Sequence, residues 1–101
     1  MSSKLGILVR LEAKQGKEVA LGEFLKSALP LAQSEPGTNI WFALKLGSHT
    51  FGVFDTFADD SGRQAHLNGE IAKALFAKAD EFLAQPPSIE MVDILAAKEP
   101  K

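Results

Sequence analysis

The spacing of apolar residues changes several times along this chain, and the order of these changes is what most constrains its fold. In four segments apolar residues alternate with other residues, which predicts β-strands because successive side chains of a strand point to opposite faces. The four segments are residues 4–14, 38–46, 50–57 and 88–96. A short turn at 47–49 separates the second segment from the third, so these two strands are expected to form a hairpin.

Between these strands, apolar residues recur every three or four positions, which is the spacing of an amphipathic helix. The first helical segment is expected to kink or stop near Pro30, whose ring crowds the preceding turn. A short helix is expected at 61–67, capped by Asp59 or Asp60, and a longer one at 70–83. The resulting order, β-α-β-β-α-α-β, predicts an α+β fold: a ferredoxin-like antiparallel sheet with helices on one face.

The second face of this sheet is also expected to be apolar. A sheet with one face in water normally alternates between apolar and polar residues. The alternation places mainly apolar side chains on the face away from the helices: Leu8, Trp41, Ala43, Phe54, Val92 and Ile94. Since the helices can cover only one face, a second copy of the chain is expected to cover the other, giving a homodimer.

Composition bounds the class of protein. The 101 residues suit one domain, 1–101, and 46% of them are apolar. A net charge of −2 disfavours nucleic acid and anionic membranes as partners. The chain has no cysteine, which excludes disulfides, thiol catalysis and cysteine-ligated metals. It also has no signal-like start and no apolar segment long enough to span a bilayer, so a cytoplasmic protein is expected.

Four short motifs follow one another at a characteristic spacing. They are Glu35-Pro36-Gly37-Thr38, residues 51–57 leading into an acidic turn, Ala65-His66-Leu67, and residues 71–76. Over nearly the whole chain, as far as Ala96, their order resembles the antibiotic biosynthesis monooxygenase family. The resemblance implies a dimeric α+β barrel.

The resemblance also implies an activity. Such members oxidise quinol-like or polyphenolic aromatics with molecular oxygen and no cofactor, because an electron-rich substrate carbanion activates oxygen directly. The family includes isomerases and haem-degrading enzymes as well, but the iron-ligating histidine of the haem degraders has no counterpart in residues 72–76. A dimer that binds a small molecule without turnover is the alternative from a different class, because a fold does not by itself assign a function.

His66 is the leading candidate for a catalytic residue. A histidine titrates near neutral pH and suits the deprotonation of a phenol or quinol, and the resemblance places this one on a helix that faces the pocket. The alternative is a structural histidine that hydrogen-bonds a neighbouring group. The other histidine, His49, is expected on the surface, and no metal site or cofactor is expected.

Asn39 and Trp41 are two positions apart and are therefore expected on the same strand face. By resemblance to family oxygenases, they are candidates to hold a planar aromatic substrate, the amide by a hydrogen bond and the indole by stacking. Trp41 has a second interpretation, as an anchor of the dimer interface. That interpretation is favoured here.

The third predicted strand and the short helix after it supply the remaining candidates for substrate binding. Asp55 is a carboxylate among apolar neighbours, so it is expected either to orient His66, to bind substrate, or to form a salt bridge with Arg10 or Arg63. Arg63 is a candidate to bind an anionic substrate oxygen, although a surface pair with Asp59 or Asp60 is the commoner outcome. Phe54 is expected to line the pocket.

Overall fold

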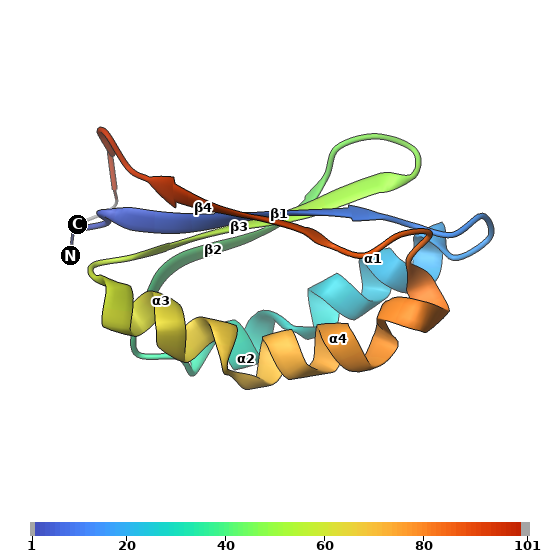
Figure 1. Cartoon of the computed structure of the whole chain (residues 1–101), viewed down its shortest axis with the longest axis horizontal. Coiled ribbons are helices and arrows are strands. Elements are labelled where there is room, and N and C mark those ends of the chain that lie inside the picture. The colour runs from blue at the N-terminus through green and yellow to red at the C-terminus, as the bar shows by residue number, and fades with distance from the viewer. Residues whose placement is uncertain (1, 100–101) are drawn as a thin grey trace.

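The computed structural model describes residues 2–99, in which one antiparallel sheet is covered on one face by helices (Figure 1). The strands are β1 (Leu5–Glu12), β2 (Thr38–Lys45), β3 (Thr50–Phe57) and β4 (Ser88–Asp93). The helices are α1 (Glu18–Ser27), α2 (Leu29–Gln33), α3 (Asp60–Leu67) and α4 (Glu70–Phe82). None of these helices is long and apolar enough to cross a bilayer.

The strand order is β2-β3-β1-β4, with every neighbouring pair antiparallel, which confirms the predicted ferredoxin-like fold. The predicted break near Pro30 is also confirmed, because α1 ends at Ser27 and Pro30 lies in the first turn of α2. A proline is tolerated there, since the first amide groups of a helix have no intrahelical partner. The first and last strands are shorter than predicted, as β1 ends at Glu12 and β4 at Asp93.

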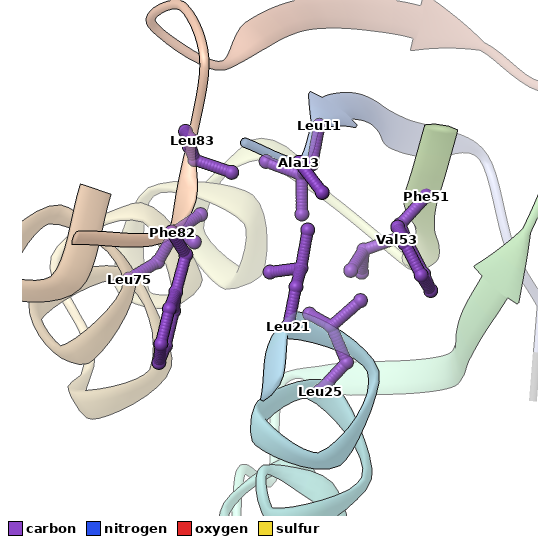
Figure 2. Packing of buried hydrophobic residues seen from close by; sticks show 9 residues of the cluster. All are labelled: Leu11, Ala13, Leu21, Leu25, Phe51, Val53, Leu75, Phe82 and Leu83. Carbon is purple, nitrogen blue, oxygen red and sulfur yellow. The ribbon is translucent and has the colours of Figure 1, made fainter. Parts of the chain in front are cut away.

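The core lies between the sheet and the helices (Figure 2). Leu11 of β1 and Leu21 of α1 are fully buried, and Phe82 of α4 packs its ring against Phe24 with centroids 5.7 Å apart. These contacts join the first and last helices to the same face of the sheet. The cluster consists of Leu11, Ala13, Leu21, Leu25, Phe51, Val53, Leu75, Phe82 and Leu83.

The faces of β2 are the reverse of those predicted. Trp41 lies opposite Asp55 of β3 and packs against the helix-facing clusters, so its predicted place on the helix-free face is wrong. Ala43 is likewise paired with Val53, a core residue. Alternation divides a strand into two sets of side chains but does not say which set meets the helices. That choice depends on the pairing of β2 with β3.

The helix-free face is nevertheless apolar, with other residues of β2 in place of Trp41 and Ala43. Leu8 and Phe54 lie opposite each other on it, as predicted, and Phe42 pairs with Phe54 and is 53% exposed. Ile40, Leu44 and Val92 share this face by register. The physical argument for a partner that covers this face therefore still applies. Phe42 is the most exposed of the apolar residues named here.

Candidate functional site

Helix α3 presents His66 to the sheet. The helix begins where the Asp59 carboxylate accepts a hydrogen bond from the Gly62 amide at 3.0 Å, which satisfies a free donor of its first turn. His66 lies in the last turn and is only 8% exposed. Its ring packs against that of Phe57 with centroids 5.5 Å apart. The imidazole is therefore buried between α3 and β3.

Both ring nitrogens of His66 meet carboxylates. Nδ1 lies 2.6 Å from Oε1 of Glu35, which precedes β2, and Nε2 lies 2.8 Å from Oδ2 of Asp55 on β3. The contact with Asp55 has the distance of a hydrogen bond but not its alignment, so we describe it as an ion pair. Asp55 is 1% exposed. We call these three residues the Asp55–His66–Glu35 triad.

The triad holds His66 in its charged form. Burial by itself lowers the pKa of an imidazole, because it disfavours the charged ring. The carboxylates of Asp55 and Glu35 outweigh that effect and raise the pKa of His66 from 6.5 to about 9. At neutral pH the residue is therefore an imidazolium with a carboxylate close to each of its ring nitrogens.

A close approach of two glycines brings Glu35 to His66. Gly37, two residues after Glu35, lies against Gly62 in the first turn of α3, and a Cβ added to Gly62 would be 2.8 Å from the Gly37 carbonyl oxygen. Glu35 is further held by Thr38, whose hydroxyl donates to the same Oε1 at 2.8 Å. Only glycine lets the loop and the helix approach this closely.

We expect Gly62→Ala to lower the free energy of unfolding by about 1–3 kcal/mol, although alanine favours helix by about 1 kcal/mol. The added methyl group would push the loop before β2 away from α3 and lengthen the contact between Glu35 and His66. Urea unfolding measures the loss, and an NMR titration of His66 should show its pKa moving toward 6.5.

Gly47→Ala is the matched control for this substitution. A Cβ at Gly47 meets nothing within 4 Å, so we expect a change within about 0.5 kcal/mol. Equal effects of the two substitutions would show that the Gly37–Gly62 approach does not position the triad.

An apolar hollow lies beside His66. It has a volume of about 50 Å³ and lies between β1, β3 and β4 on one side and α3 and α4 on the other. His66 is the one polar side chain among the described residues that line it. The other lining residues are Ile7, Val9, Val53, Leu67, Ile71, Ala72, Leu75, Phe76 and Ile89. Phe76 is the one phenylalanine among these lining residues, and the predicted Phe54 is not one of them.

The structure brings together two of the predicted site residues, His66 and Asp55. The alternative in which Asp55 pairs with Arg10 or Arg63 is wrong, because its ionic partner is His66. Arg63 donates from Nε and Nη2 to Oδ1 of Asp60, at 3.3 and 3.1 Å, as the alternative for that residue predicted. Its side chain is nevertheless only 15% exposed, since Nη1 reaches the carbonyl of Gly6 at 3.5 Å.

Asn39, Phe54 and Trp41 do not gather at the hollow. A register shift between Thr38 and Ile40 interrupts the alternation, and the Asn39 amide donates to the Ser2 carbonyl and the Ser3 hydroxyl, each at 3.4 Å. Phe54 lies on the helix-free face. Trp41 lies opposite Asp55 on the neighbouring strand, and its buried Nε1 has no hydrogen-bond partner among residues 2–99.

Sequence reasoning missed the role of Glu35, which it named only as part of a motif. The one available signal was its position in the Glu35-Pro36-Gly37-Thr38 motif, but no spacing rule links it to a histidine 31 residues later. Within the described part of the chain, no group of three or more His, Asp or Glu residues is arranged to hold a metal ion.

Comparison with solved structures identifies close and distant relatives of this fold. A protein of unknown function from Nitrosomonas europaea, NE2512, is 64% identical, with a TM-score of 0.97 over 98% of this chain and 96% of that one. PA3566 from Pseudomonas aeruginosa is 23% identical, with a TM-score of 0.80 over 95% and 98% of the two chains. A second Nitrosomonas europaea protein, provisionally named an antibiotic biosynthesis monooxygenase, is 15% identical, with a TM-score of 0.81 over 94% of each chain. No protein-family model and no curated protein sequence matches the chain.

Proposed function

We propose that this chain, which belongs to one family with the NE2512 protein of Nitrosomonas europaea, is an oxygenase that oxidises a small hydroxylated aromatic without a cofactor. Its fold is shared with proteins provisionally named antibiotic biosynthesis monooxygenases, and that likeness supports the reaction class by analogy. The observation that carries the proposal is the Asp55–His66–Glu35 triad, whose His66 lines an apolar hollow. Titratable groups with shifted pKa values beside a cavity are typical of active sites.

In the proposed reaction, the triad takes the proton of a substrate hydroxyl, and the electron-rich ring then reacts with oxygen. One oxygen atom enters the substrate and the other leaves as water, while the substrate supplies all four electrons that reduce the oxygen molecule. Since His66 is already protonated at neutral pH, it cannot act as a free base. His66 would first pass its Nδ1 proton to Glu35, whose side chain is 20% exposed and can release that proton to water, and the freed Nδ1 would then accept the substrate proton.

The test is oxygen uptake with a panel of phenols, quinols and polyphenols. We expect His66→Ala to slow uptake by about 10²–10⁴-fold, the usual contribution of a proton-transfer residue, while circular dichroism shows that the fold persists. His49→Ala is the matched control, because this histidine is exposed and pairs only with Glu18 on the surface. An unchanged rate in His66→Ala would remove His66 from the mechanism.

A second candidate function, binding of a small molecule without turnover, is favoured by one observation. Both nitrogens of His66 are engaged by carboxylates, which is also what a purely structural histidine requires. If a panel member raises the melting temperature and none consumes oxygen, this candidate replaces the oxygenase.

We also propose that two copies of the chain associate through the helix-free faces of their sheets. The apolar residues there, with Phe42 half exposed, support a partner that is itself apolar, and a second copy satisfies that condition. Sedimentation at micromolar concentration should give twice the mass of the chain, and Phe42→Glu should shift it toward the monomer. A monomeric mass for the unaltered protein would contradict the proposal.

A further inference from the structure

The lining of the hollow beside His66 restricts what can occupy it. Apart from His66, the side chains that line it are aliphatic or aromatic. Such walls offer no hydrogen bond to a ligand, so each hydroxyl buried against them would lose its water without gaining a partner. The loss lowers affinity by about tenfold or more for each such group.

The polar end of the hollow is also restricted. Nδ1 of His66 is hydrogen-bonded to Glu35, and Nε2 lies 2.8 Å from Asp55 without the alignment of a hydrogen bond, so a ligand has at most this one side chain to meet. Two carboxylates and one imidazolium leave a net negative charge in the triad. An anionic ligand would therefore be repelled, and a neutral one would not.

The mouth of the hollow is apolar as well. Phe76 of α4 and Ile89 of β4 both line it, and they are 55% and 39% exposed. Pockets that bind drug-sized ligands normally have volumes of about 300–1,000 Å³, whereas the volume of this hollow is about 50 Å³. A ring can enter only if these rim side chains turn outward, and their exposure means that little core packing opposes the movement.

We propose that the hollow binds a neutral, mainly apolar molecule with a single hydroxyl group, such as an alkylphenol, and excludes polyphenols and carboxylates. The inference rests on the proposed function in that it concerns the same site, and it narrows the substrate class from polyhydroxylated aromatics to monohydroxylated ones. The alkyl part lies against Ile71, Leu75 and Phe76, and the hydroxyl lies toward His66.

The test compares the binding of four ligands of similar size to the unaltered protein. Binding of 4-propylphenol, propylbenzene, 4-propylbenzoate and benzene-1,2,3-triol is followed by NMR shifts of the methyl groups of Ile71, Leu75 and Ile89. We expect 4-propylphenol to bind at least about tenfold more tightly than the benzoate and the triol. Equal or tighter binding of the triol or the benzoate at these methyl groups would overturn the proposal.

A pair of tryptophan substitutions on α4 then locates the site. Ala72 lines the hollow and Ala77 is exposed on the same helix outside its lining, so Ala72→Trp should block 4-propylphenol while Ala77→Trp should not. Equal weakening by both would overturn the location. The ligand comparison needs no variant, so it stands even if Ala72→Trp does not fold.

Failure of this inference can be distinguished from failure of the oxygenase proposal. Selective binding of 4-propylphenol without oxygen uptake would support the inference and contradict the activity. Uptake of oxygen with the triol, together with tight binding of the triol beside Ile71, would support the activity and contradict the inference.

Discussion

Raising the pH from about 6 to about 9.5 is expected to lower the free energy of unfolding by up to about 3 kcal/mol through His66 alone. The folded protein holds the His66 proton with a pKa of about 9, while the unfolded chain releases it near 6.5. A pKa that is raised on folding contributes stability that is fully present below about 6.5 and is lost as the pH rises toward 9. Urea unfolding at several pH values across this window measures the loss.

Two histidine substitutions isolate this contribution. His66→Gln should remove it, so the difference in unfolding free energy between the unaltered protein and this variant should shrink as the pH rises. His49→Gln is the control, since His49 is exposed and its pair with Glu18 lies at the surface, where an ion pair contributes little. A difference between the unaltered protein and His66→Gln that stays constant within about 1 kcal/mol would show that the triad does not hold the proton.

Most of the architecture follows from local spacing. The four strands and the helix break at Pro30 were predictable because alternation and proline chemistry act within a few residues. The orientation of β2 was not, because it depends on pairing with β3 and on the register shift between Thr38 and Ile40. Trp41 and Asn39 consequently lie in different surroundings although they are two positions apart.

The candidate site was predictable only in part. Asp55 stood out because a carboxylate among apolar neighbours requires a partner, and one of the expected partners, His66, is the one it has. Glu35 could not be found in the same way. It reaches His66 through the contact of Gly37 with Gly62, which is a tertiary contact between a loop and a helix and has no local sequence pattern.

Removing the buried carboxylate should have the other large effect: we expect Asp55→Ala to lower the free energy of unfolding by about 3–5 kcal/mol at pH 6, where His66 of the unaltered protein is charged. Asp55 is 1% exposed and lies 2.8 Å from the imidazolium, so its loss leaves a buried charge with Glu35 as the remaining partner. The loss should be smaller at about pH 9.5, because His66 of the unaltered protein has then lost most of its charge and its ion pair with Asp55. Urea unfolding of the two proteins at each pH gives the loss in unfolding free energy at pH 6 and at about pH 9.5.

The double substitution Asp55→Leu with His66→Leu distinguishes a charge effect from a packing effect. It removes both buried charges and leaves Glu35, which is partly exposed and still accepts a hydrogen bond from Thr38. A buried ion pair replaced by apolar residues of similar volume is often tolerated, so the double variant should be more stable at pH 6 than Asp55→Ala. Asp93→Ala, at an exposed carboxylate of β4, should change stability by less than about 0.5 kcal/mol. If Asp55→Ala costs no more than Asp93→Ala, the triad is not a stabilising unit and His66 is held by packing alone.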